Sequence, residues 1–465
     1  MQEMIKNNWN KIYQKAPATL ENMAKIKNVA CAFNTCIDSV IKIRGKDIST
    51  FIKEEKLSLS QLTNIKSKSI NSVSDFIKGI FYCFRNGIAE EWTSDNQKMF
   101  DWMLSTLGTK KMQMGGQAGI VANTLSLTNI QEIIVHSNAL SKLQSAQFLK
   151  KDNLLSFDKD GKIKPAFTIN RDKISSIHWI VEFDKNDTIN IEKNSFVCPK
   201  SNRFIATYDP PLFDFKIDKH FLNYSTTSNI QYYFLSGFQA LSYHNHGLKY
   251  INNSVNIIKQ WKKNNPKSII HLEIASTQDK IIRKAIAKKL IPIVDSVGVN
   301  ERETIDILEV IGNTKIYKSC LKNPTVSNMF EGLLNIKQKL KCPRIQMHMY
   351  GIYITIQDKN FPVSPQKIRN GMILAATAAA SKASVGHLKT KEDILSACKT
   401  DINEKSLKEL EILSKYIKSD NLLKNGICSY KNFDIISIPA KIIEKPKTLV
   451  GMGDTISSFS IIGAC

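Results

Sequence analysis

The sequence lacks any long apolar run. Its longest candidate, Met372–Ala380, is followed by Ser381 and Lys382, which is far short of the roughly 20 apolar residues that a membrane helix needs. The opening residues, MQEMIKNNWNKIYQKAP, contain no apolar segment followed by a cleavage-like site, so no secretory signal is expected. These absences predict a chain that does not cross a bilayer.

Paired cysteines are also missing. Nine cysteines are scattered without a CxxC pair, and several lie in apolar segments, among them Cys31, Cys83 and Cys342. An odd number argues against a complete disulfide framework. We therefore expect a cytoplasmic protein in a reducing compartment, without structural zinc.

Acidic residues are the minority charge. Lys and Arg number 65 against 42 Asp and Glu, which gives a formal net charge of +23. The lysines are spread along the whole chain and form no basic tail, so a solvated surface is favoured over a nucleic-acid partner. The same surface would attract a phosphorylated substrate, and this possibility stays open.

Common nucleotide-binding signatures are absent as well. The chain contains no GxxxxGK[ST], no GxGxxG before a helix and no HRD-type loop, which argues against P-loop and protein-kinase chemistry. Short β-branched runs at 268–276, 296–300 and 344–356 alternate with helical patterns. This alternation predicts an α/β fold with a parallel sheet covered by helices.

A different texture appears in two regions. Residues 40–110 are mostly helical in pattern and rich in charge, and 178–183 with 202–209 resemble a pair of strands. A chain of 465 residues is long enough for two or three compact units. We expect these regions to form a second, smaller domain.

The segment GMGDT near the C-terminus carries the clearest chemistry. An apolar run at 435–438 predicts a strand before it, and 456–462 predicts a helix after it. Backbone N–H groups from Gly451 to Asp454 would then lie at a helix N-terminus, where they attract an anion. Asp454 beside that anion is a candidate base; the alternative is an Asp that only caps the helix.

Acidic residues follow two predicted strands. Alternation in IIHLEIAS places His271 and Glu273 on one strand face, and Asn300 and Glu303 follow the next strand. Such carboxylates suit Mg²⁺, which takes one or two of them together with phosphate oxygens and water. A buried His–Glu pair and an acidic first helical turn are the structural alternatives. Together with the glycine turn, the pattern favours phosphoryl transfer.

Polar residues near the N-terminus suit a sugar. Asn34 and Asp38 lie at the end of a strand-like run, and MGGQAGIVAN at 114–123 predicts a Gly-Gly turn that opens a helix at Gln117. Side chains of this kind can match hydroxyls that both donate and accept hydrogen bonds. Two ordinary turns are the alternative.

These motifs together resemble one family. NTCID, MGGQAGIVAN, HWIVEF, NRFIATYDPP, LSGFQAL, HLEIAS, VGVNERET and VGMGDTISS occur in the order seen in the ADP-dependent glucokinases and phosphofructokinases of archaea, within the ribokinase-like superfamily. The resemblance runs from about residue 8 to the end. The lid segment FRNGIAEEW aligns less closely, and the chain ends eleven residues after Asp454, so a short last helix is expected.

The resemblance implies a fold and its division. A large ribokinase-like α/β domain, with a central mostly parallel sheet flanked by helices, would comprise 1–36, 115–165 and 212–465. A smaller discontinuous α+β lid would comprise 37–114 and 166–211. Sugar and nucleotide would meet between them, and the protein would be a monomer or a small homo-oligomer.

The resemblance also implies roles for individual residues. Asp454 would be the base, and Gly451, Met452 and Gly453 would form the anion hole. His271, Glu273, Asn300, Glu303 and Asp454 would serve Mg²⁺, for which other divalent cations can substitute. The sugar side would comprise Asn34, Asp38, Glu90, Gly115, Gly116, Gln117, His178 and Arg203, and the nucleotide side would comprise His348, Tyr353, Ile443 and Val450.

The implied reaction belongs to a modified glycolysis. The β-phosphoryl group of ADP would pass to fructose 6-phosphate, giving fructose 1,6-bisphosphate and AMP, and also to glucose. Arg203 suits a sugar phosphate, whereas Glu90 and Glu91 suit an unphosphorylated hydroxyl. A glucokinase only and a non-catalytic sugar- or nucleotide-binding protein are the alternatives.

Overall fold

Two β-sheets, each with its own apolar core, organise the chain. The computed structural model describes residues 2–65, 67–108, 111–448 and 450–465. Leu449, within the segment expected near the adenine, lies outside the described residues. The α/β class expected from the sequence is confirmed.

Eleven of the described strands form the larger sheet. Its strands from β15 to β6 run parallel, and those at both edges are antiparallel. Their order across the sheet is β17 (Ile427–Tyr430), β18 (Phe433–Pro439), β16 (Ile352–Asp358), β15 (Arg344–Met349), β14 (Ser296–Val299), β13 (Ile269–Glu273), β12 (Tyr232–Leu235), β1 (Asn28–Ala32), β5 (Glu132–Val135), β6 (Leu154–Phe157) and β7 (Ile163–Pro165).

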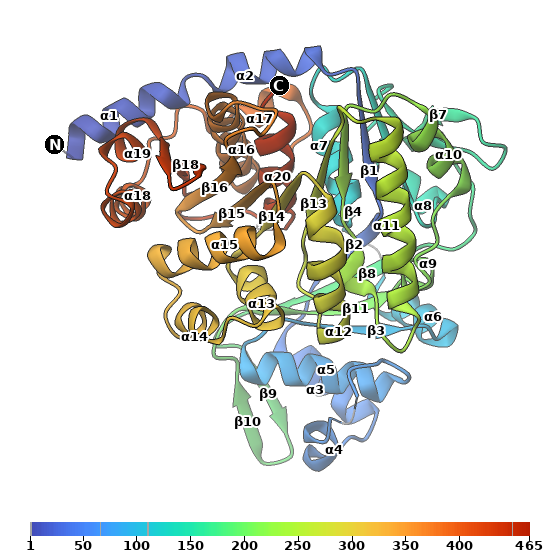
Figure 1. The fold of residues 1–465 in the computed structure, drawn as a ribbon. Helices are drawn as coiled ribbons and strands as arrows, with labels where there is room; N and C mark the ends of the chain where they lie inside the picture. Colours follow the sequence, from blue (N-terminus) through green and yellow to red (C-terminus); the bar gives the residue numbers. More distant parts are fainter. Residues whose placement is uncertain (1, 66, 109–110, 449) are drawn as a thin grey trace.

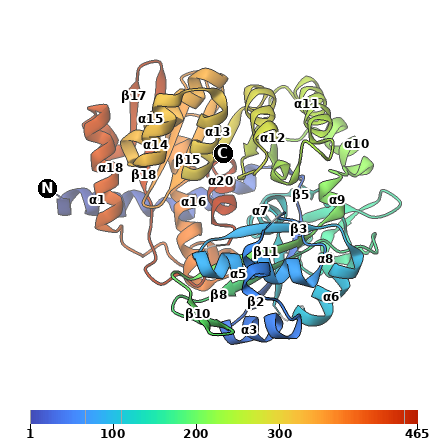
Figure 2. The same ribbon diagram turned by 90° about the horizontal axis from the view of Figure 1, so that it is seen from below.

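Helices cover both faces of the larger sheet (Figures 1 and 2). One layer contains α10 (Lys219–Thr227), α11 (Gly247–Asn264), α12 (Lys280–Ala285), α13 (Glu301–Ile311), α14 (Thr314–Lys322) and α15 (Val326–Leu340). The other contains α7 (Gln117–Ser126), α16 (Pro365–Val385) and α20 (Met452–Ile462), which pack on one another. No helix in the described part of the chain is long and apolar enough to span a membrane.

Shorter helices border these layers. The N-terminal helices run along the upper edge of the larger sheet in Figure 1, and α18 and α19 lie beside the first of them. Their bounds, with those of the remaining short helices, are α1 (Gln2–Tyr13), α2 (Ala16–Asn22), α8 (Lys142–Ser145), α9 (Pro210–Phe213), α17 (Lys391–Ile394), α18 (Glu404–Ile417) and α19 (Asp420–Asn425).

A five-stranded sheet lies below the larger one in Figure 1. Its order is β3 (Glu90–Ser94), β11 (Asn202–Tyr208), β8 (Ile177–Phe183), β2 (Cys36–Lys42) and β4 (Met112–Gly115). One face packs an aromatic core with Trp92, Trp179 and Phe204. The helices on this side are α3 (Gly45–Glu54), α4 (Leu59–Thr63), α5 (Val73–Asn86) and α6 (Gln97–Leu107), and a hairpin of β9 (Thr188–Ile191) and β10 (Asn194–Val197) packs beside α3.

The chain passes between the two sheets at short junctions. β1 ends at Ala32 and β2 begins at Cys36, while β4 ends at Gly115 and α7 begins at Gln117. The carboxyl ends of the parallel strands are the usual location of ligand sites in open α/β sheets. Asn34, Gly115, Gly116 and Gln117, which were singled out in the sequence, lie at these junctions. The predicted division into a large domain and a lid stays a prediction.

Candidate active site

The GMGDT segment forms the start of a buried helix. α20 begins at Met452, earlier than the sequence suggested, because its N-cap Gly451 adopts a left-handed conformation with φ 64°. A side chain at Gly451 would approach Lys382 Nζ to 2.8 Å and Ile120 to 2.9 Å. No side chain caps this N-terminus among the described residues, so the helix offers free N–H groups to an anion.

Asp454 lies in the first turn of α20 and does not cap it. Only 8% of the residue is exposed. Burial raises the pKa of its carboxyl to about 6, against the opposing effects of Lys382 and of a hydrogen bond with Gln117. A carboxylate of that pKa is mostly ionised at neutral pH and can accept a proton.

Lys382 was missed in the sequence and completes this turn. It comes from α16, and its Nζ donates to Gly451 O at 3.0 Å and to Thr455 Oγ1 at 3.4 Å. Burial lowers the pKa of Lys382 to about 8, whereas Asp454 and Asp38 raise it. The ammonium therefore brings positive charge to the same place as the helix N-terminus. An Ala-rich helix interrupted by one lysine was the only signal available in the sequence.

Asn34 and the Gly-Gly turn meet beside Asp454. Asn34 O accepts from the N–H of Ala118 at 3.0 Å, which fixes the start of α7. A Cβ on Gly116, where φ is 72°, would lie 2.6 Å from Asn34 O. Asn34 Oδ1 and Gln117 Oε1 are buried without a hydrogen-bond partner in the described part of the chain. Buried acceptors of this kind are normally satisfied, so they fit the hydroxyls of a ligand.

The sequence suggested that Asp38 lies at the end of the first strand. In the structure it lies within the next strand, β2. It is opposite His178 in the parallel register of β2 and β8. Burial raises the pKa of Asp38 to about 6, while His178 lowers it. The place of Gly115 is explained here, because a side chain at that position would collide with the Asp38 carboxyl.

His178 is held from two sides. Its Nε2 donates to Asp209 Oδ2 at 3.2 Å, and its Nδ1 lies 4.0 Å from Glu91 Oε1. Glu91 in turn accepts from Thr207 Oγ1 at 2.6 Å. Asp209 is thus part of this site, although the sequence had not indicated it, and so is Glu91, which the sequence had indicated only as suited to an unphosphorylated hydroxyl.

The structure corrects the placement of Glu90. Its carboxylate accepts from Lys68 Nζ at 2.8 Å and from Trp92 Nε1 at 3.0 Å, on the core side of β3. Alternation along a strand places Glu91 on the opposite side, with His178. The sequence already indicated this face for Glu90. Residues two positions apart on a strand share a face, so Glu90 lies on the same side of β3 as the apolar Trp92.

Arg203 lies on β11, on the same side of the sheet as Thr207 by alternation. Four residues along a strand separate their Cα atoms by about 13 Å, so Arg203 stands at the far end of the face that carries His178. Its strand partner is Glu182. Among the residues that the structure describes, Arg203 forms no ion pair.

The acidic residues meet at the carboxyl ends of β13 and β14. His271 Nε2 lies 3.1 Å from Glu273 Oε2, and Asn300 forms a reciprocal capping box with Glu303 through bonds of 2.8 and 2.9 Å. The buried His–Glu pair and the acidic first helical turn, which the sequence offered as structural alternatives, are therefore both present. A side chain at Gly298 would collide with Glu273, so the glycine leaves room for this carboxylate.

Electrostatics link this acidic group to the helix turn. Burial and the Glu303 charge raise the pKa of Glu273 well above its usual range. Burial raises the pKa of Glu303 to about 8, and Asp454 adds to the shift. Carboxylates that destabilise one another in this way are stabilised by a bound cation. Their oxygens do not converge on one point among the described residues, which suits an ion that keeps water in its shell.

The four nucleotide candidates come from β15, β16 and the loop before α20. His348 adjoins the anion turn, because a side chain at Gly453 would meet its Nε2 at 2.8 Å. Tyr353 is the neighbour of His348 across β15 and β16. Val450 lines a hollow of about 360 Å³ with Lys382 and other residues, and Ile443 is half-buried in the preceding loop.

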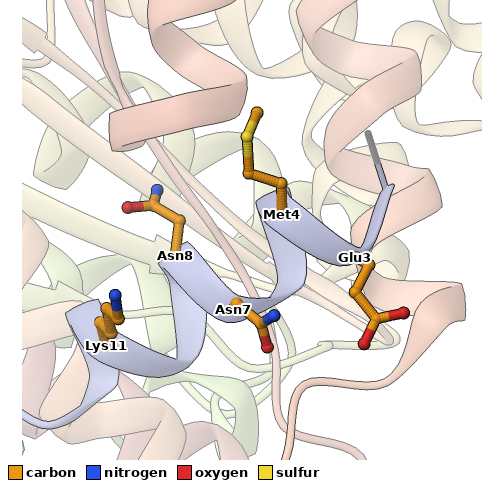
Figure 3. Close-up of a pocket in the computed structure, with 5 residues that line it drawn as sticks. All are labelled: Glu3, Met4, Asn7, Asn8 and Lys11. Carbon is orange, nitrogen blue, oxygen red and sulfur yellow. The ribbon is translucent and has the colours of Figure 1, made fainter.

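A separate hollow on α1 lacks this convergence (Figure 3). Its residues come from one exposed helix, and their side chains fan out from the helix axis. They are Glu3, Met4, Asn7, Asn8 and Lys11. The candidate site residues therefore lie between the two sheets and not at this hollow.

Comparison with known proteins gives consistent matches over the whole chain. Residues 27–463 match the ADP-specific phosphofructokinase/glucokinase conserved region. An ADP-dependent glucose/glucosamine kinase of Pyrococcus furiosus is 30% identical, with 98% of each chain covered. The solved structure of a last common ancestor of ADP-dependent phosphofructokinases from Methanosarcinales superposes with a TM-score of 0.85 at 30% identity, with 98% of each chain covered. An ADP-dependent kinase in complex with fructose-6-phosphate and ADPβS superposes with a TM-score of 0.83 at 29% identity, covering 98% of this chain and 97% of that one.

Proposed function

Because the chain belongs to the ADP-specific phosphofructokinase/glucokinase family, we propose that it transfers the β-phosphoryl group of ADP to a hexose. Fructose 6-phosphate is the favoured acceptor and gives fructose 1,6-bisphosphate and AMP. The relative solved with fructose-6-phosphate and ADPβS supports this choice. Glucose is the second acceptor, in line with the name of the Pyrococcus furiosus relative.

The observation that carries the proposal is the position of Asp454. Its carboxylate stands in the first turn of α20, beside an uncapped helix N-terminus and the Lys382 ammonium. In the proposed step Asp454 accepts the proton of the sugar hydroxyl while that oxygen forms a bond to the β-phosphorus. The bond between this phosphorus and the oxygen that bridges it to AMP breaks, and AMP leaves with the electron pair.

The N–H groups of the turn hold the charge of the transferred group. Gly451, Met452 and Gly453 supply them, and Lys382 adds a cation within hydrogen-bond distance of the turn. Phosphoryl transfer demands little covalent chemistry from a protein, so positioning and charge stabilisation account for most of the rate.

Glu273 and Glu303 are proposed to hold a divalent cation, and Mg²⁺ is the preferred one. Asp454 lies next to it. When bound, the ion neutralises charge on the phosphates of ADP. His271 orients Glu273, and Asn300 orients Glu303, through the hydrogen bonds described above. The raised pKa values of the two glutamates support the fit, because burial and like charges otherwise disfavour their ionised forms.

The sugar is proposed to bind between the two sheets. Asn34, Gln117, Asp38 and His178 face it with buried polar atoms, and Gly115 and Gly116 let it approach the backbone. Arg203 is proposed to bind the phosphate of fructose 6-phosphate at the outer end. The five-stranded sheet with 37–114 and 166–211 acts as the lid, and adenine packs near His348, Tyr353, Ile443 and Val450.

An assay of AMP release tests the proposal. The purified protein is given ADP and Mg²⁺ with fructose 6-phosphate or with glucose, and AMP and sugar phosphate are quantified. We expect equimolar AMP and fructose 1,6-bisphosphate, a slower reaction with glucose, and a rate about 10²–10⁴-fold lower for Asp454→Asn. Tight binding of sugar and ADP without any AMP would instead favour the non-catalytic alternative.

A further inference from the structure

Three potential metal ligands converge on the small-sheet side of the site. Cys36 and Asp38 lie on one face of β2, and His178 is opposite Asp38 on β8. Cys36 Sγ is 3.7 Å from His178 Nδ1 and 3.8 Å from Asp38 Oδ1. One ligand atom from each of the three lies within 4.8 Å of the others, and no other such group occurs among the described residues.

These separations match a tetrahedral zinc site. With zinc–sulfur bonds of about 2.3 Å and zinc–nitrogen or zinc–oxygen bonds of about 2.0–2.2 Å, two ligands of a tetrahedron lie about 3.5–3.7 Å apart. The two measured edges at Cys36 differ from this by a tenth or two of an ångström. Only 1% of Cys36 and 7% of Asp38 is exposed, so the ligands are held in place before an ion arrives.

The hydrogen bond that supports the His178 ring is also typical of a histidine that binds a metal. Its other nitrogen, Nε2, donates to the fully buried Asp209, and a carboxylate in this position fixes the ring for coordination through Nδ1. Asp209 is itself held by Ser176 Oγ at 2.6 Å and by the N–H of Leu212 at 3.2 Å.

Gly115 leaves room for an ion, and Glu91 is a candidate for the fourth ligand. A side chain at Gly115 would collide with the Asp38 carboxyl and approach Cys36 Sγ to 2.8 Å. Glu91 Oε1 lies 4.0 Å from His178 Nδ1, and its side chain is 44% exposed. That position is open to Glu91 or to water, unlike a structural zinc site with four fixed protein ligands.

We propose that Cys36, Asp38 and His178 bind a thiophilic divalent cation of the Zn²⁺ class, which occupies the sugar side of the site and excludes the hexose. The Cys36 proton is released on binding, because the thiolate is the ligand. Mg²⁺ prefers oxygen ligands and does not compete for the thiolate. The loss of sugar binding rests on the proposed function, whereas the metal site itself does not.

Direct binding to the full chain tests the metal site. Zn²⁺ is titrated against a chromophoric chelator in the absence of sugar and nucleotide, and Co²⁺ serves as a spectroscopic probe. We expect one tight equivalent of Zn²⁺, and a cobalt spectrum with thiolate-to-metal charge transfer and tetrahedral visible bands. If the unmodified protein gives a cobalt spectrum without charge transfer, this result alone overturns the proposal.

Variants assign the site. Cys36→Ser should weaken Zn²⁺ binding by more than about 100-fold, beyond the 10–100-fold expected for Asp209→Asn, which removes only a supporting bond. Cys398→Ser, which removes a thiol outside the group, should bind Zn²⁺ as the unmodified chain does. Unchanged Zn²⁺ affinity in Cys36→Ser overturns the assignment.

Competition separates this proposal from the proposed function. Fructose 6-phosphate should weaken Zn²⁺ binding, and Zn²⁺ should raise the KM for the sugar at saturating ADP and Mg²⁺. An active sugar kinase that binds no Zn²⁺ at Cys36 overturns the metal site and leaves the function intact. A protein without kinase activity that still gives the cobalt charge-transfer band supports the metal site and contradicts the function.

Discussion

Asp454 is the residue on which the proposed chemistry depends. Asp454→Asn keeps the shape of the side chain but removes the proton acceptor, and loss of a general base costs about 10²–10⁴-fold in rate. We expect kcat to fall by that amount, while the dissociation constants for sugar and ADP change little. Steady-state kinetics and calorimetric titrations check this. A variant that keeps more than about a tenth of the parent kcat would show that another group is the base.

Lys382 should affect both rate and pH dependence. Its positive charge lowers the pKa of Asp454, so Lys382→Met should raise that pKa above its present value of about 6. The acidic limb of the kcat profile, where Asp454 becomes protonated, should then move to higher pH. Loss of a charge that stabilises the transferred phosphoryl group should lower kcat/KM for ADP by about 10²-fold.

Lys389→Met is the matched control for this experiment. Lys389 is exposed and lines the same hollow as Lys382, but in the described part of the chain only its backbone N–H forms a hydrogen bond, to Asp393. Its kcat profile should coincide with that of the unmodified protein. If both variants lose activity equally without a shift of the acidic limb, the lysines act only through the general basic surface.

At the level of elements, the junction of β18 and α20 demands a glycine. Gly451 and Gly312 both adopt left-handed conformations at helix ends, with φ 64° and 80°. A side chain at Gly312 meets nothing within 4 Å, whereas one at Gly451 meets Lys382 and Ile120. Gly312→Ala should cost about 1–2 kcal/mol, because an alanine is strained in the left-handed conformation, and Gly451→Ala about 1–3 kcal/mol more because neighbours must move.

Thermal unfolding midpoints and ADP titrations measure this pair. Gly451→Ala should unfold at a lower temperature than Gly312→Ala and bind ADP more weakly, since the N–H groups of the turn are displaced. Equal midpoints and equal ADP affinities would mean that the turn tolerates a Cβ.

The ends of β13 and β14 should determine the metal requirement. Glu303→Gln and Glu273→Gln each remove one carboxylate from the acidic group, so the Mg²⁺ concentration for half-maximal rate should rise about 10–100-fold. Glu301→Gln alters the same first turn of α13 outside that group, and serves as control. Unchanged Mg²⁺ dependence in both site variants would return these residues to a structural role.

At the scale of the whole molecule, we expect the choice of sugar to depend on the residues that the five-stranded sheet presents toward the larger sheet. Arg203→Ala should lower kcat/KM for fructose 6-phosphate by a factor that corresponds to about 2–4 kcal/mol of activation free energy, the scale of a lost charge-assisted contact with an unpaired phosphate. Glucose use should change little. Lys200→Ala, an exposed position nearby in sequence, should leave both sugars unaffected.

The two adjacent glutamates sharpen this test. Glu91→Gln should weaken glucose use, because Glu91 shares a face with His178, whereas Glu90→Gln should affect neither sugar. Equal losses for both sugars in Arg203→Ala would assign the arginine to closure of the two sheets and not to phosphate recognition.

Local features of the sequence were sufficient for the fold class and for the local geometry of several candidate site residues. Strand and helix periods, the Gly451 turn, the acidic first turn after Asn300 and the alternation of His271 with Glu273 each depend on neighbouring residues only. Backbone geometry and side-chain direction follow from such short-range patterns. The order of the motifs then indicated the family.

Only the tertiary structure decided which distant residues meet. Lys382 reaches the turn before Asp454, and Asp209 supports His178, across separations of many residues. Cys36 became a ligand candidate only when β8 was placed beside β2. These contacts depend on strand order and register, which one sequence does not fix by local pattern, since a single-residue shift turns every side chain to the other face.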